Sequence, residues 1–190
     1  MKILHVITTL EKGGAEKQLV ILSRNQAAQD HEISVLPLKG NLELDKDFSS
    51  FKAQIFDDIR NRNFFIQILL FRKLVKQKRF DVIHLHLPRA EILGVLASLG
   101  LKIFAVSSRH NTEPFFPGSP RLVSTLLSRM ILIRQSSVIA ISNSVRTFLV
   151  SRREISKRQP IPVIYYGYDE TIIISKQPRE LSDGEKLEKF

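Results

Sequence analysis

Two adjacent glycines follow the first apolar run of the sequence, at a point where the backbone can bind an anion. Gly13 and Gly14 come after the apolar residues 2–8 and lead into a helical pattern with Glu16 in its first turn. Free N–H groups and the positive dipole end of a helix start favour a phosphate or carboxylate there. A tight turn with one glycine at positive φ is the alternative. Neither G-x-G-x-x-G nor a P-loop is present, which argues against nicotinamide enzymes and P-loop ATPases.

A second candidate segment contains two histidines, His84 and His86, followed by Arg89. In a strand, this spacing places both histidines on the same face, with His86 nearer the carboxyl end. A metal ion would need a third ligand, and no cysteine or carboxylate cluster supplies one. We therefore predict hydrogen-bonding histidines and no metal, with His86 and Arg89 as candidate ligand-binding residues.

Two further polar segments follow apolar runs later in the chain. The first contains Arg109, His110 and Asn111, and the second contains Ser142 and Asn143. Polar residues at the carboxyl end of a buried strand are frequent ligand contacts. The alternative for the first segment is a surface loop in which Asn111 only makes turn hydrogen bonds. Capping of the next helix is sufficient to explain Ser142 and Asn143.

The elements that must position these residues alternate regularly along the chain. Runs typical of strands are residues 2–8, 32–38, 53–56, 81–86, 103–108, 138–142 and 162–165. Stretches of helical period are residues 15–29, 64–78, 89–99, 120–135 and 144–155. This alternation predicts an α/β, Rossmann-like, doubly wound and mostly parallel sheet with helices on both faces. The polar segments then lie on one rim, at the carboxyl ends of the strands.

Composition bounds the class of protein. The 190 residues are 43% hydrophobic, enough for one domain, which we place at residues 1–170, before a polar tail or linker at 171–190. The absence of cysteine excludes disulfide scaffolds and fits a cytoplasmic location. A net charge of +10 favours anionic partners. We expect no nucleic acid among them, because an aromatic-rich basic strand and a helix-turn-helix are both missing.

Residues 64–79 combine apolar side chains with a cluster of positive charge. The basic residues in and beside this segment are Arg62, Arg72, Lys73, Lys76, Lys78 and Arg79. This composition is typical of a helix that lies on an anionic membrane surface. The alternative is that the apolar residues face the sheet and leave an ordinary solvated basic edge.

Five collinear segments resemble the N-terminal domain of family 4 glycosyltransferases, retaining, nucleotide-sugar-dependent enzymes of GT-B architecture. They are residues 2–7 leading to 13–16, 81–86, 107–111, 138–145 and 161–169. The last segment differs from the family's usual Tyr-Asn-Gly-Val-Asp because it contains Tyr166 and Tyr168.

The resemblance implies roles for particular residues. Gly13 and Gly14 would face the diphosphate of a UDP- or GDP-sugar donor, with no other cofactor. His110 would correspond to the family histidine that contacts the donor sugar near the reaction centre, which makes it the catalytic candidate. The remaining candidates named above would contact donor or acceptor, and the domain would chiefly hold a glycan or lipid-linked acceptor for cell-envelope polysaccharide or lipopolysaccharide synthesis.

The family's second domain, which provides most of the donor contacts, has no counterpart in these 190 residues. We therefore expect the acceptor-binding half of a hexosyltransferase, inactive alone and peripheral on the inner face of the membrane. The alternative is a non-catalytic scaffolding subunit that recruits a separate C-terminal donor-binding chain to the membrane.

Overall fold

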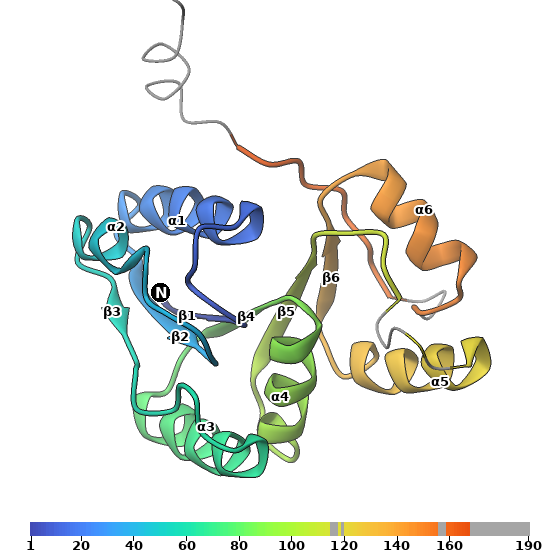
Figure 1. The fold of residues 1–190 in the computed structure, drawn as a ribbon, viewed down its shortest axis with the longest axis horizontal. Coiled ribbons are helices and arrows are strands. Elements are labelled where there is room, and N and C mark those ends of the chain that lie inside the picture. The colour runs from blue at the N-terminus through green and yellow to red at the C-terminus, as the bar shows by residue number, and fades with distance from the viewer. Residues whose placement is uncertain (115–117, 119, 156–158, 168–190) are drawn as a thin grey trace, which may run out of the picture.

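Six parallel strands form one sheet within residues 1–114, 118, 120–155 and 159–167, the part of the chain that this computed structural model describes (Figure 1). The strands are β1 (Lys2–Ile7), β2 (Glu32–Pro37), β3 (Gln54–Ile55), β4 (Val82–His86), β5 (Phe104–Arg109) and β6 (Ser137–Ala140). Their order is β3-β2-β1-β4-β5-β6, so the direction of strand addition reverses between β1 and β4. The predicted doubly wound parallel sheet is confirmed, and ligands of such sheets bind at this reversal.

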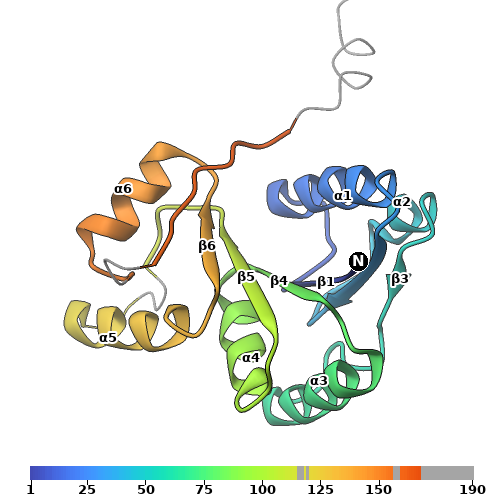
Figure 2. The same cartoon turned by 180° about the vertical axis from the view of Figure 1, so that it is seen from behind.

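Helices cover both faces of the sheet (Figure 2). They are α1 (Gly14–Ala27), α2 (Asp45–Ser49), α3 (Phe64–Lys78), α4 (Pro88–Ser98), α5 (Arg121–Leu132) and α6 (Asn143–Ser151). Helices α1 and α2 lie on one face, and α3, α4 and α5 lie on the other. Helix α6 packs beside α5 on Val138 and Ala140 of β6. The short helix α2 was not predicted, because its five residues contain too few apolar positions to show a helical period.

The seventh strand, predicted at residues 162–165, is reduced to one parallel bridge between Val163 and Ala140. The Ala140 N–H donates to the carbonyl of Pro162, and the Ile164 N–H donates to the carbonyl of Ala140. Pro162 itself has no N–H to donate back toward β6, so the ladder is interrupted on the side of the residues that precede Val163. That strand prediction was wrong in extent, although the segment does lie beside β6.

Alternation along β1 divides the core into two layers. Leu4 and Val6 pack with Phe71 of α3 on one face of the sheet. Ile3 and Ile7 pack with α1 and α2 on the other face. His5 lies between Ile3 and Ile7 in sequence and is fully buried, so a polar ring interrupts the apolar row on the α1 face.

Helix α3 divides its apolar residues between the core and solvent. Phe71 and Val75 are buried, whereas the side chains of Phe65 and Leu69 are 75% and 68% exposed. Arg72 donates to the carbonyls of Ala97 and Leu99, which ties it to the end of α4. Part of the apolar side of residues 64–79 therefore faces the sheet and part faces solvent, and the membrane contact stays a prediction. Within the described residues, every helix falls short of the length and hydrophobicity that a membrane-spanning segment needs. The tail predicted at 171–190 lies outside those residues.

Candidate functional site

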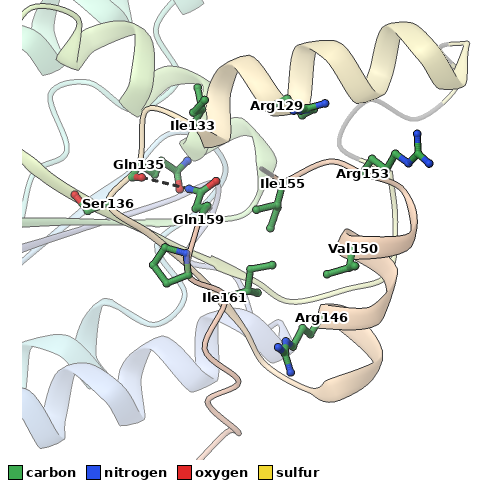
Figure 3. A pocket seen from close by; sticks show the side chains of 11 residues that line it. Arg129, Ile133, Gln135, Ser136, Arg146, Val150, Arg153, Ile155, Gln159 and Ile161 are labelled. Atoms are coloured by element: carbon green, nitrogen blue, oxygen red, sulfur yellow. Dashed lines mark hydrogen bonds between the residues drawn. The ribbon is translucent and has the colours of Figure 1, made fainter. Parts of the chain in front are cut away.

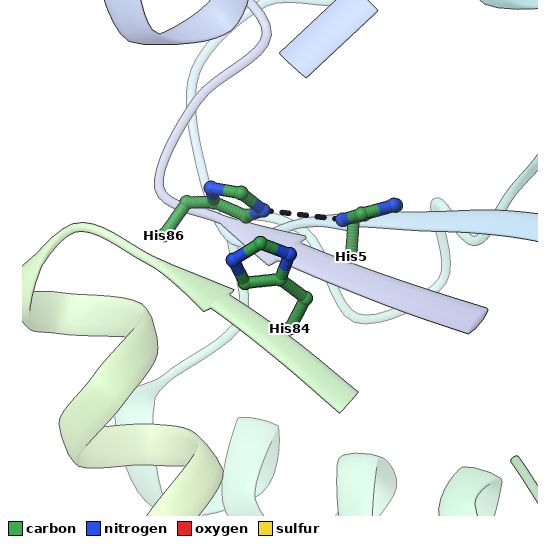
Figure 4. Close-up of side chains that lie close together, drawn as sticks. All are labelled: His5, His84 and His86. Atoms are coloured by element: carbon green, nitrogen blue, oxygen red, sulfur yellow. Dashed lines mark hydrogen bonds between the residues drawn. The ribbon is translucent and has the colours of Figure 1, made fainter. Parts of the chain in front are cut away.

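Three buried histidines lie side by side on the α1 face of the sheet (Figure 4). His84 and His86 come from β4 and share one face, as predicted, with ring centroids 4.1 Å apart. His5 comes from the neighbouring strand β1, where it is in register with His84. Its centroid is 5.3 Å from the centroids of both other rings.

Hydrogen bonds extend this cluster from α1 to the rim of the sheet. Nε2 of His5 lies 2.8 Å from Oε1 of Gln26, and Nδ1 of His5 lies 3.1 Å from Nε2 of His86. Nδ1 of His86 is 3.4 Å from Nε2 of His110, whose Nδ1 is 2.5 Å from the hydroxyl oxygen of Tyr166. The cluster is therefore one end of a continuous chain that reaches the predicted catalytic histidine.

All of these rings are neutral at pH 7. Burial lowers the pKa of His5 to about 4 and that of His110 to about 4. Burial, together with the neighbouring histidines, lowers the pKa of His84 and that of His86 well below the ordinary value. A neutral imidazole carries one N–H donor and one acceptor nitrogen, so each ring can pass a hydrogen bond from one neighbour to the next.

His5 supplies the third histidine that the sequence alone did not place beside His84 and His86. The potential ligand atoms of the three lie within 4.8 Å of one another, which is close enough for a metal ion. However, Nδ1 of His5 and Nε2 of His86 face each other at hydrogen-bond distance (Figure 4). Nε2 of His84 is 2.7 Å from Oγ of Ser108. We interpret the cluster as a hydrogen-bonded network, and the absence of a metal stays a prediction.

The glycine loop after β1 is closed by an acidic side chain. The N–H of Gly13 donates to the carbonyl of Glu11 at 2.8 Å, and the carboxylate of Glu16 lies against Gly13. Oγ1 of Thr9 donates to Glu16 at 2.7 Å. In this arrangement a carboxylate occupies the position that suits an anion at the start of α1.

The alternative interpretation of this loop, a tight turn with one glycine at positive φ, is wrong. Gly13 has φ −106°, and Gly14 is not among the described glycines of positive φ. Neither glycine is therefore required for a left-handed turn. Their loop follows β1, and the Arg109–Asn111 segment begins at the last residue of β5, so in this parallel sheet both lie on one rim, as predicted.

Arg109 lies in a buried ion cluster on the opposite face from the histidines. Its guanidinium is 3.1 Å from Glu154 and 3.8 Å from Glu91, and all three side chains are at most 1% exposed. Burial raises the pKa of Glu91 to about 7, and the nearby Arg109 opposes that rise. The cluster links β5, α4 and the segment that follows α6, which is a structural role for Arg109.

The other predicted residues lie around the rim with local partners. Arg89 donates to Gln67 of α3 at 3.1 Å and lies over the Phe64 ring, away from the histidines. The Asn111 amide donates to Glu113 at 3.0 Å within its own loop. Ser142 caps α6 by accepting from the N–H of Val145. The Asn143 amide donates to the hydroxyl of Tyr165 at 3.0 Å, beside Tyr166.

A cavity of about 490 Å³ lies along the α1 face, and part of the hydrogen-bonded chain described above lines it. His84, His86, Ser108, His110 and Tyr166 line it, together with apolar residues of α1 and the strands. A larger hollow between α5 and α6 contains Arg129, Arg146 and Arg153 (Figure 3). No predicted site residue lines that second hollow.

Three participants were missed by sequence reasoning. His5 and Gln26 lie within ordinary strand and helix patterns, and nothing local distinguishes them. Tyr166 carried a signal, because it departs from the motif of the resembled family at a rim position.

Comparison with known proteins places this geometry in a family. The family model described as Glycosyltransferase Family 4 matches residues 12–171, which is most of the chain. The chain belongs to glycosyltransferase family 4. The family resemblance predicted from the five motifs is thereby confirmed.

Two curated relatives of this family 4 domain are bacterial glycosyltransferases. The first is a GalNAc-alpha-(1->4)-GalNAc-alpha-(1->3)-diNAcBac-PP-undecaprenol alpha-1,4-N-acetyl-D-galactosaminyltransferase of Campylobacter jejuni. It is 30% identical over 122 residues, covering 60% of this chain and 34% of the relative. The second is the capsular polysaccharide biosynthesis glycosyltransferase CapH of Staphylococcus aureus, 23% identical over 176 residues, covering 89% and 48%. The chain thus spans between a third and a half of these relatives.

Solved structures agree on the fold. A glycosyltransferase from Rickettsia africae superposes with a TM-score of 0.70 at 19% identity, covering 94% of this chain and 46% of that one. Anabaena Alr3699/HepE, solved with UDP and glucose, superposes with a TM-score of 0.68 at 21% identity, covering 90% and 46%. The family 4 domain therefore has the fold of one half of these chains.

Proposed function

We propose that this chain is the acceptor-binding half of a retaining glycosyltransferase that moves a sugar from a nucleotide-sugar to a glycan or lipid-linked acceptor. The observation that carries the proposal is the cavity lined by His86, His110 and Tyr166 in a family 4 domain. Neutral imidazole and phenol groups can hydrogen-bond sugar hydroxyls without bringing a full charge.

His110 is the residue that we propose to act at the reacting sugar. It follows the carboxyl end of β5, lines the cavity and is neutral at pH 7. A neutral hydrogen-bonding group that strengthens its contact as charge develops on the sugar would raise turnover. Asn143 and Tyr165 lie on the same rim and are candidate acceptor contacts.

The donor that we propose is a UDP- or GDP-sugar, and no other cofactor is needed for this chemistry. The Anabaena protein was solved with UDP, which supports that class. In this chain, however, the Glu16 carboxylate lies against Gly13 and would repel a diphosphate. We therefore propose that donor binding depends mainly on a second domain or a separate C-terminal chain, and that these 190 residues are inactive alone.

We also propose peripheral contact with an anionic membrane through the outer face of α3. Phe65 and Leu69 are exposed on this face, and Lys73 and Lys76 continue it at helical spacing. The Campylobacter relative is named for an undecaprenol-linked acceptor, which supports a membrane location for the reaction. The same face favours the second candidate function, a non-catalytic subunit that recruits a donor-binding chain to the membrane.

Ligand binding to the purified chain tests the proposal. Undecaprenyl-diphosphate-linked N-acetylgalactosamine in detergent micelles should bind, and UDP-N-acetylgalactosamine should bind about tenfold more weakly. The two together should release no UDP. A matched His110→Ala variant should lose acceptor or donor binding while remaining folded. Tight binding of the donor without the acceptor would contradict the acceptor-binding assignment, and binding of neither would favour the scaffolding function.

A further inference from the structure

A chain of four hydrogen bonds runs from helix α1 to the rim of the sheet. It joins Gln26, His5, His86, His110 and Tyr166, with donor–acceptor distances of 2.8, 3.1, 3.4 and 2.5 Å in that order. Its members come from α1, β1, β4, the loop after β5 and the segment beside β6. The order of protons along such a chain is determined at its ends.

The Gln26 end of the chain determines the direction of all four hydrogen bonds. Oε1 of Gln26 is an amide oxygen and only accepts, so Nε2 of His5 must carry the proton. Nδ1 of a neutral His5 then accepts, and it can accept only from a protonated Nε2 of His86. By the same reasoning Nδ1 of His86 accepts from Nε2 of His110, and Nδ1 of His110 accepts from the hydroxyl of Tyr166.

We propose that Gln26 is a positioning residue that orders these protons, so that Tyr166 donates to His110 and presents an acceptor oxygen to the ligand. Tyr166 is then a specificity-determining residue for groups that donate a hydrogen bond. The ordering of the protons follows from this geometry alone, and the assignment of a sugar ligand rests on the proposed function.

The ligand class follows from the direction of the chain. With its proton engaged by His110, the Tyr166 oxygen accepts from a sugar hydroxyl or from the N–H of an N-acetyl group. The oxygens of an ionised pyrophosphate are acceptors only, so they cannot satisfy it. Burial and the nearby Glu16 raise the pKa of Tyr166, which keeps the phenol protonated. Tyr166 should therefore contact the sugar rather than the diphosphate of a nucleotide-sugar.

Nitrogen NMR of the histidine side chains tests the direction, because protonated and unprotonated ring nitrogens have well-separated shifts. In the wild-type chain, His5, His86 and His110 should all carry the proton on Nε2. Gln26→Glu keeps an acceptor at this position and should leave these tautomers unchanged. Gln26→Lys provides only donors and should move the proton to Nδ1 in all three rings. His84, which bonds Ser108 outside the chain, is the internal control.

Several results would overturn the proposal. A proton on Nδ1 of His86 or His110 in the wild type would reverse the chain, and this result does not depend on whether Gln26→Lys folds. A change at His5 alone in Gln26→Lys would show that the rings are uncoupled. Binding of Zn²⁺ with loss of the Nε2 proton of His86 from the His5–His86 contact would replace the chain by a metal site.

The ligand assignment has its own measurement. N-acetylgalactosamine should perturb the His110 and Tyr166 resonances, whereas pyrophosphate at the same concentration should not, and Tyr166→Phe should abolish the sugar effect. Perturbation of these resonances by pyrophosphate alone, or by neither probe, would overturn the role of Tyr166 in sugar recognition. Failure of the proposed function would leave the wild-type tautomers unchanged, so the two failures are distinguishable.

Discussion

The Nδ1 atom of His110 lies 2.5 Å from the hydroxyl oxygen of Tyr166, 56 positions later in the chain. His110 follows β5, and Tyr166 lies in the segment beside β6, so the contact joins two neighbouring parts of the rim. Both residues line the cavity on the α1 face. This contact connects the predicted catalytic residue with a side chain that no local motif assigned to the site.

Replacement of His110 by alanine should lower stability moderately and leave the fold intact. The substitution leaves Nδ1 of His86 without its partner inside the protein. An unsatisfied buried polar group costs about 1–3 kcal/mol. Urea denaturation should show a loss of that size, with an unchanged slope. A loss well above this range would indicate that His110 has a mainly structural role.

Stability should fall as the pH falls from 7 to 5. The unfolded chain protonates its histidines near 6.5, whereas the pKa of His5 and that of His110 are lowered to about 4 in the folded state. The unfolded state therefore binds more protons in this window, at about 2 kcal/mol for each of these two histidines at pH 5. Urea midpoints measured at both pH values should show the loss, and equal midpoints would contradict the buried neutral rings.

Glu91→Gln should make that fall steeper. The pKa of Glu91 is raised to about 7 in the folded protein, so this group binds a proton on folding and opposes the histidines between pH 7 and 5. Glutamine keeps the shape and removes the titration. If the pH dependence of the urea midpoint is the same in both proteins, Glu91 is not the opposing group.

Arg109→Met should destabilise the protein by about 3–5 kcal/mol, because it leaves the buried carboxylates of Glu91 and Glu154 without this cation. Thermal unfolding of the single variant Arg109→Met and of the double variant Arg109→Met, Glu91→Gln measures this loss of stability. The double variant should recover part of the loss, since it buries one fewer unpaired charge. If Arg109→Met is as stable as wild type but binds ligand more weakly, Arg109 instead belongs to the ligand-binding site.

Substitutions in the glycine loop should have opposite effects. An added Cβ at Gly14 meets no atom within 4 Å, and this residue begins α1, so Gly14→Ala should be neutral or stabilise by up to about 1 kcal/mol. A Cβ at Gly13 would collide with Glu16, so Gly13→Ala should displace that carboxylate. The melting temperatures of Gly14→Ala and Gly13→Ala check these two effects. UDP binding by wild type and by Glu16→Gln tests whether the Glu16 carboxylate excludes a diphosphate from the loop. Equal UDP binding by Glu16→Gln and wild type would contradict that closure.

Membrane binding through α3 should require both kinds of exposed side chain. Liposomes with acidic lipid should sediment the chain at low salt, and Lys73→Glu with Lys76→Glu should release it, because each basic residue contributes about 1 kcal/mol near an acidic leaflet. Phe65→Ser with Leu69→Ser keeps the charge and should weaken binding that survives added salt. The matched control is Arg79→Gln, just beyond the helix. Equal sedimentation of all variants would remove α3 from the membrane contact.

The architecture and the residues at the rim of the sheet could be predicted from local patterns in the sequence. Runs of Ile and Val alternating with helical periods are local patterns, and a parallel sheet is the arrangement that buries such runs on both faces. The rim positions of Gly13, His86 and His110 follow from that topology, because each comes at or after the carboxyl end of a strand. The family motifs are also local, and they identified the family before any contact was known.

The contacts between polar residues, in contrast, could not be predicted without the three-dimensional structure. His5 contacts His86 because β1 and β4 pair in one register, and that register depends on packing between residues about 80 positions apart. Successive side chains of β5 likewise point to opposite faces of the sheet. Ser108 bonds His84 on one face, and Arg109 pairs with Glu91 and Glu154 on the other. Such contacts are non-local, because they depend on strand register and on the depth of burial. Neither quantity can be predicted from the residue types of a single segment.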